Sequence, residues 1–180
     1  MRIQETPELT IHQPQYPEVE VRPAVRSELS AVCRLVSAAY AEFEPYLSPL
    51  NWARMTANII RVIESGASGQ LLVAHLAGRL AGTVTYLPSG PKDYRRVPQD
   101  WAVIRVLGVD PALRGHGVAR ALTEECLARA RAERAPAVGL HTAEMMTAAR
   151  ALYEGIGFVR QDDFTHLDIR FCIYIYRLKT

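Results

Sequence analysis

The chain has 180 residues, enough for a single domain, since domains commonly run to about 100–200 residues. Hydrophobic residues make up 49% of the sequence and charged residues 22%, which is ordinary for a globular protein and excludes disordered and collagen-like chains. The net charge of +2 is too small for the dense basic surface that nucleic-acid binding usually needs.

The start of the chain predicts an N-terminal extension over residues 1–18, which lack hydrophobic periodicity, followed by one domain over residues 19–180. The extension carries acids and prolines but no apolar export signal, and no stretch approaches the roughly 18 apolar residues of a membrane span. Cys33, Cys126 and Cys172 are far apart, so neither a disulfide framework nor a metal site is expected. We therefore expect a cytoplasmic protein.

The first part of the domain predicts one strand and two helices. Residues 19–24 alternate like a short strand, and Ser27 then has the character of a helix N-cap before apolar residues at helical spacing. Ser48 followed by Pro49 is typical of the start of a second helix, which Gly66 can end.

The hydrophobic period then changes to that of strands. Residues 70–76 and 81–87 flank a tight polar spacer around Gly78, which predicts a β-hairpin. After a proline-rich loop, residues 101–109 predict a longer and largely buried strand. Gly108 near the end of this strand indicates a bulge or a close backbone approach.

The last third predicts two more helices and three more strands. The helices are expected at residues 116–134 and 147–155, and the strands at 137–142, 158–161 and 171–178. The whole order is β-αα-β-β-β-α-β-α-β-β. This order predicts an α/β (mixed α+β) fold, a mixed sheet with helices on both faces.

The junction after the long strand, VDPALRGHGVA at residues 109–119, predicts a binding site for an anion. A turn with Gly115 and Gly117 leads into a helix N-terminus, where backbone N–H groups lack intrahelical acceptors and the helix dipole adds about half a positive charge. The absence of side chains at the two glycines lets a pyrophosphate approach the main chain. A purely structural turn is an alternative. A dinucleotide-binding oxidoreductase is another, although Arg120 stands where its third glycine is needed.

Two motifs resemble those of a known family. RGHGVA at residues 114–119 matches the R/Q-x-x-G-x-G/A signature of the GNAT superfamily of acetyl-CoA-dependent N-acetyltransferases. ARALYEGIGF at residues 149–158 is similar to the closing motif of that family, A-x-x-L-Y-E-x-x-G-F. The order of elements from Val19 onward is also similar, so the resemblance covers about nine-tenths of the chain. It implies a mostly antiparallel sheet of about seven strands.

The resemblance implies acetyl-CoA as cosubstrate, no metal, and a set of residues that bind the cosubstrate. Backbone amides of six residues in the turn would hold the pyrophosphate: Arg114, Gly115, His116, Gly117, Val118 and Ala119. The main chain of Leu107 and Val109 would bind the pantetheine arm. Tyr153 would protonate the departing thiolate, which reference pKa values of about 8.5 for a thiol and about 10 for a phenol allow. A core aromatic is the alternative for Tyr153. Met146 departs from the Asn that the family often carries there, so one amide contact to the cofactor is missing.

The acceptor side needs a route for a proton, because only about 1 part in 2,500 of an alkyl amine with pKa near 10.4 is neutral at pH 7. The strand over residues 101–109 offers no carboxylate. Candidate bases are His141 at a strand end, Glu144 after it, and Glu42 and Glu44 between the first two helices. The resemblance places this last segment beside the acceptor pocket, where its acids would suit a cationic or aromatic amine. The alternative for each is an ordinary surface acid or a hydrogen-bonded histidine.

Taken together, the sequence predicts direct transfer of an acetyl group from acetyl-CoA to a primary amine of a small molecule or a protein N-terminus. The sequence lacks the G-x-S-x-G nucleophile motif, so it gives no indication of an acyl-enzyme intermediate. A non-catalytic acyl-CoA-binding regulatory domain is the alternative. The loops expected at residues 41–50, 88–100 and 161–170 do not identify the acceptor, and the apolar FCIYIY strand at residues 171–176 can pair at a homodimer interface.

Overall fold

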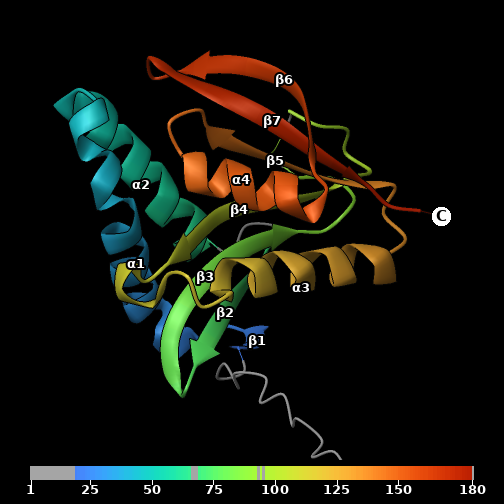
Figure 1. Cartoon of the computed structure of the whole chain (residues 1–180), viewed down its shortest axis with the longest axis horizontal. Coiled ribbons are helices and arrows are strands. Elements are labelled where there is room, and N and C mark those ends of the chain that lie inside the picture. The colour runs from blue at the N-terminus through green and yellow to red at the C-terminus, as the bar shows by residue number, and fades with distance from the viewer. Residues whose placement is uncertain (1–18, 66–68, 93, 95, 180) are drawn as a thin grey trace, which may run out of the picture.

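One sheet runs through the part of the chain that the structure, a computed structural model, describes: residues 19–65, 69–92, 94 and 96–179 (Figure 1). Its strands are β1 (Val19–Pro23), β2 (Gln70–Leu76), β3 (Arg79–Leu87), β4 (Ala102–Val109), β5 (Ala137–Ala143), β6 (Val159–His166) and β7 (Ile169–Arg177). The strand order is β1-β2-β3-β4-β5-β7-β6, and every neighbouring pair is antiparallel except β4 and β5. The predicted mixed, mostly antiparallel sheet of seven strands is confirmed.

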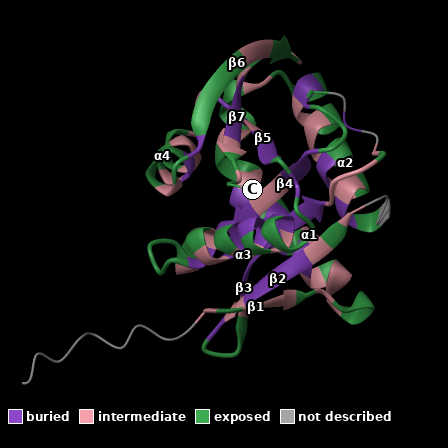
Figure 2. Cartoon of the chain, turned by 90° about the vertical axis from the view of Figure 1, so that its right-hand side faces the viewer, coloured by how far each residue is buried: buried purple, intermediate pink, exposed green. Residues whose placement is uncertain are grey.

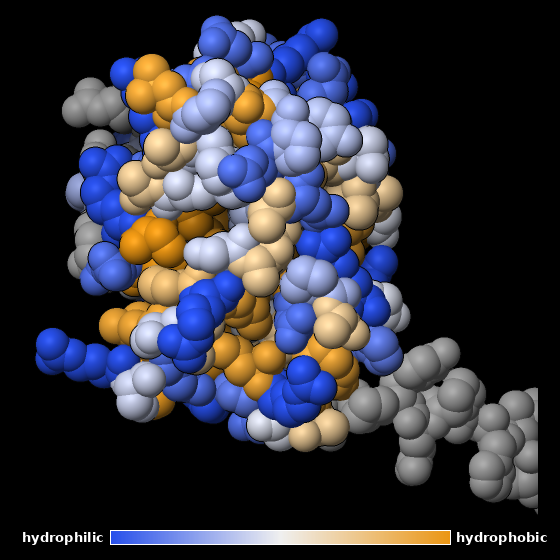
Figure 3. Space-filling model, turned by 90° about the vertical axis from the view of Figure 1, so that its left-hand side faces the viewer, coloured by the Kyte–Doolittle hydropathy of each residue, from blue (hydrophilic) through white to orange (hydrophobic). Residues whose placement is uncertain are grey.

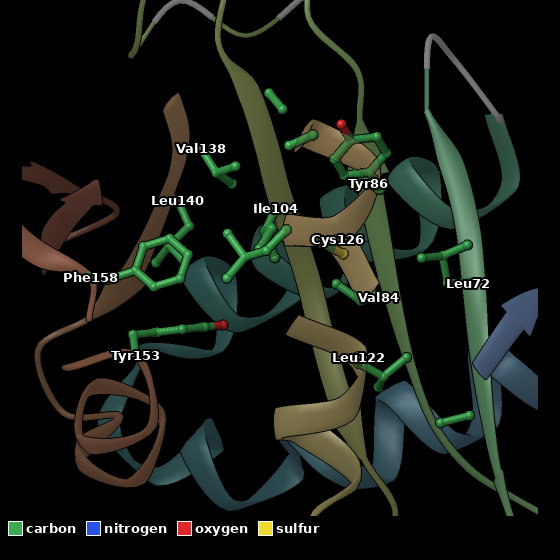
Figure 4. Packing of buried hydrophobic residues seen from close by; sticks show 14 of the residues in the cluster. Leu72, Val84, Tyr86, Ile104, Leu122, Cys126, Val138, Leu140, Tyr153 and Phe158 are labelled. Atoms are coloured by element: carbon green, nitrogen blue, oxygen red, sulfur yellow. The ribbon is translucent and has the colours of Figure 1, made fainter. Parts of the chain in front are cut away.

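Helices cover both faces of this sheet (Figure 2). They are α1 (Leu29–Tyr40), α2 (Pro49–Ser65), α3 (Val118–Ala132) and α4 (Thr147–Ile156). Helices α3 and α4 share one core with the sheet, in which Leu122, Cys126 and Tyr153 pack against strand residues such as Leu140 (Figure 4). Helices α1 and α2 bury their own apolar stripes on the opposite face. The face of the sheet on which a strand side chain lies therefore decides which helices it meets.

The helix starts agree with the sequence in one case and differ in the other. Ser48 caps α2 as predicted, because its Oγ accepts the backbone N–H of Asn51 at 3.3 Å. Ser27 does not cap α1, so that prediction is wrong. It lies inside a short 3-10 turn, where the carboxylate of Glu28 accepts the N–H of Val25 at 2.9 Å, the bond that a glutamate at the third helical position makes in a capping box.

Two tight turns join neighbouring strands. Ala77 and Gly78 connect β2 to β3 with φ values of 49° and 76°, and Leu167 and Asp168 connect β6 to β7 with φ values of 51° and 60°. Positive φ at both central residues is typical of the two-residue hairpin turn that suits twisted strands. The prediction of a loop at residues 161–170 is therefore wrong, because these residues form the hairpin of β6 and β7. This stretch was missed because β6 is an edge strand with mostly exposed side chains, which leaves no apolar alternation to detect.

Strand β7 lies between β5 and β6, so the expected pairing of this strand with a second copy is wrong. Both of its edges are already hydrogen-bonded, so its backbone cannot pair with a second copy. Its apolar run has a different cause. Cys172 and Tyr174 face the core under α3 and α4, whereas Ile173 and Ile175 face a second core with Trp101 on the other side of the sheet.

The remaining predictions concern the chain ends of these elements, membrane spans and the cysteines. The predicted extension over residues 1–18 and the predicted helix end at Gly66 lie outside the described residues. Within the described part, none of the helices is both long and apolar enough to cross a membrane. Cys33, Cys126 and Cys172 are all unpaired, as their spacing predicted.

Candidate functional site

The centre of the sheet opens where β4 and β5 separate. The two strands pair at only two positions, of which Val103 with Gly139 is the last. Beyond this point β4 bulges, with Val106 at a φ of 51°. The bulge predicted at Gly108 is therefore two residues too late. A Cβ at Gly108 would lie 3.4 Å from a methyl group of Val36 on α1, which is ordinary van der Waals contact, so the predicted close backbone approach is not found there. The separation leaves main-chain groups of both strands without a partner across the gap.

The main chain of Val109 is turned toward this gap. The next residue, Asp110, donates its N–H to the carbonyl of Ala81 in β3 at 2.8 Å. Because successive peptide groups along an antiparallel strand point to opposite sides, the N–H and C=O of Val109 point away from β3. The carbonyl of Leu107 is already used, since it accepts the hydroxyl of Tyr40 on α1 at 3.1 Å. Of the two predicted main-chain contacts, that of Leu107 therefore shares its carbonyl with Tyr40.

The turn between β4 and α3 has the geometry of an anion site. Gly115 and Gly117 have φ values of 81° and 79°, and a Cβ added to either glycine would meet no heavy atom within 4 Å. Among the described residues, no backbone acceptor pairs with the N–H groups of residues 115–119. His116 lies in the turn as predicted, with its Nδ1 2.9 Å from the carbonyl oxygen of Arg114. The open space, the unpaired amides and the N-terminus of a 15-residue helix together fit a phosphate group.

The side chain of Arg114 ties this turn to the neighbouring helix. Its Nη2 lies 2.7 Å from Oε1 of Glu42 and donates to the carbonyl of Ala39 at 3.1 Å. Glu42 is therefore held in an ion pair. Glu44 lies on the same 3-10 helix, Ala41–Tyr46, where the sequence suggested a loop, and it is exposed without an ion pair to any described residue.

Tyr153 is both a core residue and a hydroxyl donor. Its ring is 5% exposed and meets the edge of Phe158 at a centroid distance of 5.6 Å, while its hydroxyl points from α4 toward β4 (Figure 4). That hydroxyl makes no hydrogen bond with any described residue. Among the described residues, the fully buried side-chain N and O atoms that lack a hydrogen bond are only those of His75 and Thr85. The hydroxyl oxygen of Tyr153 is not among them, so it is not fully buried. Burial, and then the nearby Tyr40, raise the pKa of Tyr153 well above its usual value, so the phenol keeps its proton at neutral pH.

Met146 stands at the start of α4, where its N–H is bonded to the carbonyl of Ala143. Its Sδ accepts the hydroxyl of Thr142 at 3.5 Å. A thioether has no N–H to donate, so the side chain cannot replace an asparagine as a donor to a ligand.

A pocket of about 470 Å³ opens on the face of the sheet opposite α3 and α4. Its polar lining consists of Asn58, Arg96, Arg105, His141 and His166. Its aromatic lining consists of Tyr94, Phe164 and Phe171. These residues come from α2, from the segment before β4, and from strands β4 to β7. Figure 3 views the side that carries α1 and α2 and shows hydrophobic residues grouped in the middle of that face with hydrophilic ones around them.

His141, a predicted base, lies in this pocket in a neutral form. Its ring stacks on Tyr94 at a centroid distance of 5.6 Å, and the Tyr94 hydroxyl lies 2.5 Å from Nδ1. Burial, followed by the positive charges of Arg105 and Arg96, lowers the pKa of His141 to about 3. The imidazole is uncharged at pH 7, and it is a weak base.

Glu144, the other candidate base on this strand, lies elsewhere. Its carboxylate is 3.6 Å from Arg160 and 3.9 Å from Arg170. Arg160 is opposite Tyr174 in the register of β6 and β7, and Tyr174 faces the core under α3 and α4. Glu144 therefore belongs to that face of the sheet, and the structure does not bring it together with His141.

Sequence reasoning missed the pocket wall made by Tyr94, Arg96 and Phe164. These residues lie in segments without apolar periodicity, and only the sheet topology brings them together. Among the described residues, no group of three or more His, Cys, Asp or Glu side chains is placed to hold a metal ion.

Comparison with known proteins gives one family. The sequence model of the acetyltransferase (GNAT) family matches residues 30–158. The mycothiol acetyltransferase of Salinispora tropica is 41% identical over 96 residues, which are 52% of this chain and 30% of that protein. That of Thermobispora bispora is 47% identical over 57 residues, 32% of this chain and 19% of that protein. The chain thus spans less than a third of the length of these curated relatives.

Solved structures show the same fold. The yncA structure from Salmonella typhimurium, with its cofactor acetyl-CoA, has a TM-score of 0.67 at 16% identity over 91% of this chain and 95% of that chain. The ribosomal-protein-S18-alanine N-acetyltransferase from Escherichia coli has a TM-score of 0.65 at 18% identity, covering 91% of this chain and 96% of that one.

Proposed function

The chain belongs to the acetyltransferase (GNAT) family, and on that premise we propose that it transfers the acetyl group of acetyl-CoA directly to a primary amine. Acetyl-CoA supplies a thioester whose carbonyl carbon accepts a nucleophile. The observation that carries the proposal is the opening between β4 and β5, with an anion-binding turn on one side and a pocket on the other. A donor and an acceptor can meet through this opening without a covalent enzyme intermediate.

The donor side is assigned to main-chain groups. The amides of residues 115–119 bind the pyrophosphate, and the N–H and C=O of Val109 bind the amide groups of the pantetheine arm. The carbonyl of Leu107 already accepts the hydroxyl of Tyr40, so Val109 is the main contact to the arm. The main chain supplies these contacts without the side-chain amide that Met146 replaces.

Tyr153 is assigned to the departing thiolate. Because burial holds the pKa of its hydroxyl above that of an ordinary phenol, complete proton transfer to a thiolate of reference pKa about 8.5 is uphill. Its first contribution is therefore a hydrogen bond that stabilises the negative charge as the carbon–sulfur bond breaks. Transfer of the proton follows only if the same burial also raises the pKa of the thiol.

The acceptor side works by charge rather than by a strong base. A primary amine forms the new carbon–nitrogen bond only after its ammonium form has lost a proton. None of the described residues that line the pocket is a carboxylate, and His141 is a weak base. The burial and the two guanidinium groups, of Arg96 and Arg105, that lower the pKa of His141 also lower the pKa of an ammonium held beside it. The amine can then release its proton to water.

A thiol-release assay tests this function. The protein is incubated with acetyl-CoA and a panel of primary amines, and free CoA is measured over time. We expect release that depends on the amine. Binding of acetyl-CoA without release in the presence of any amine would instead make the chain an acyl-CoA-binding regulatory domain. The acceptor of the mycothiol acetyltransferases belongs in the panel as one member only, because the chain matches less than a third of their length.

A further inference from the structure

The acceptor pocket carries positive charge on an aromatic surface. Two of its lining residues are arginines, Arg96 and Arg105, and no Asp or Glu is found among its described lining residues. The same two guanidinium groups act on His141 in the pocket wall, since after burial the charges of Arg105 and Arg96 are the largest causes of its lowered pKa. A second cation brought into this pocket is repelled, whereas an anion is attracted.

Arg96 is the guanidinium group best placed to bind a ligand. Its Cζ lies 3.4 Å from the centroid of the Phe164 ring, so the guanidinium packs over an aromatic face. It forms no hydrogen bond or ion pair with any described residue, and it is exposed. By contrast, Arg114 is paired with Glu42 and Arg160 is paired with Asp163. The N–H donors of Arg96 are therefore available.

The aromatic floor beside Arg96 suits a flat or apolar group. Phe164 stacks on Phe171 at a centroid distance of 5.1 Å and an interplanar angle of 10°. Both rings also meet the edge of His141, at 5.5 and 5.4 Å. An apolar side chain packed here lies next to both the guanidinium of Arg96 and the imidazole of His141.

Resting on the proposed function, we infer that the acceptor amine also carries a carboxylate, bound by Arg96, and an apolar or aromatic side chain that packs on Phe164 and Phe171. The acceptor then belongs to the chemical class of amino acids with apolar side chains. A planar guanidinium matches a carboxylate with two parallel N–H donors, which an ammonium of lysine cannot do. The acids of residues 41–46 do not oppose this class, since Glu42 is paired with Arg114 and neither Glu42 nor Glu44 is among the described lining residues of the pocket.

The test compares acids with their neutral amides. L-Phenylalanine, L-leucine and L-methionine are offered with acetyl-CoA beside the corresponding amino-acid amides and spermidine. We expect the kcat/KM of each acid to exceed that of its amide by about tenfold to hundredfold, the usual range for a charge-assisted hydrogen bond. Equal or faster turnover of the amides or of spermidine would overturn the inference while leaving amine acetylation intact.

Substitution of Arg96 tests the assignment of the residue. In Arg96→Gln we expect the ratio of the kcat/KM of each acid to that of its amide to fall at least tenfold, with the KM for acetyl-CoA unchanged. Arg96→Lys keeps the positive charge but lacks the two parallel N–H donors of a guanidinium. It should restore part of the preference for the acids that Arg96→Gln loses. Arg54→Gln, an exposed position on α2 outside the pocket lining, is the matched control and should behave as the unsubstituted chain. An unchanged ratio of acid to amide in Arg96→Gln would contradict the assignment.

A binding measurement separates this inference from the proposed function. L-Phenylalanine should raise the melting temperature of the chain in the absence of acetyl-CoA, L-phenylalaninamide should not, and Arg96→Gln should abolish the difference. If no amine releases thiol, the proposed function fails and this binding result alone decides the inference. Identical melting temperatures with the acid and the amide would then reject it.

Discussion

The hydroxyl oxygen of Tyr94 lies 2.5 Å from Nδ1 of His141, and the two rings stack with an interplanar angle of 6°. This contact joins the segment before β4 to the end of β5, at the pocket that we assign to the acceptor. Burial raises the pKa of Tyr94 to about 12 and lowers that of His141 to about 3, so both partners are uncharged at pH 7. The charge of this wall therefore comes from its arginines.

The neutral state of His141 predicts how stability depends on pH. Its pKa is about 3 in the folded protein and about 6.5 when unfolded, so the unfolded chain binds the proton more readily. The stability linked to neutral His141 is fully present above about pH 6.5 and is lost as the pH falls from there toward 3. We expect urea unfolding at pH 7.5 to 4 to show a shallower fall in His141→Phe than in the unsubstituted chain. His116→Gln, an exposed position, should leave the fall unchanged. Parallel curves for the chain and His141→Phe would contradict this account.

Removal of the Tyr153 hydroxyl should affect turnover more than binding or folding. Since this hydroxyl has no partner among the described residues, Tyr153→Phe should leave the free energy of unfolding nearly unchanged. We expect kcat to fall about a hundredfold, as for the loss of a hydrogen-bond donor to the developing negative charge, and the acetyl-CoA Kd to stay within twofold. Tyr176→Phe removes a hydroxyl at the far end of β7, near Arg131, and serves as the control with unchanged kcat. Equal kcat values for all three proteins would make Tyr153 a core residue only.

The anion-binding turn can be tested with two glycines of the same backbone conformation. Gly117 in the turn and Gly78 in the β2–β3 hairpin have φ values of 79° and 76°, and neither has a neighbour within 4 Å of an added Cβ. Replacement by Ala should lower the free energy of unfolding by about 1 kcal/mol at both positions. Only Gly117→Ala should weaken acetyl-CoA binding, by about tenfold or more, because its methyl group enters the space above the amides. Calorimetric titration that finds equal affinities for the two variants would place the pyrophosphate elsewhere.

Glu144 should contribute little to the reaction. Its carboxylate is paired with Arg160 and Arg170 on the face away from the acceptor pocket. Glu144→Gln should therefore keep kcat within twofold at every pH between 6 and 9. A loss of a hundredfold that is restored at high pH, where amines deprotonate unaided, would return Glu144 to the role of general base.

The proposed binding site for acetyl-CoA could be predicted from the sequence because the residues that form it are close together in the chain. Gly115, Gly117 and the following helix are consecutive, and hydrophobic period alone placed the strand before them. The element order and the mixed sheet followed in the same way, from the alternation in residues 70–87 and the helical spacing around Leu122.

The acceptor half could not be predicted because its residues meet only in three dimensions. Arg96 and Phe164 are 68 positions apart in the chain, and only the first residues of β6, at 158–161, were predicted as a strand because most of its side chains are exposed. The protonation state of His141 could not be predicted from the sequence either. The sequence identified His141 as a possible base, but the lowered pKa depends on burial and on two arginines from different segments.

The most direct test of the account is the product itself. Mass spectrometry of a reaction with acetyl-CoA and an apolar amino acid should find the N-acetylated amine and free CoA in equal amounts, both abolished when the amine is omitted. Saturable binding of acetyl-CoA with no N-acetylated product from any amine in the panel would contradict the central claim that this chain acetylates amines.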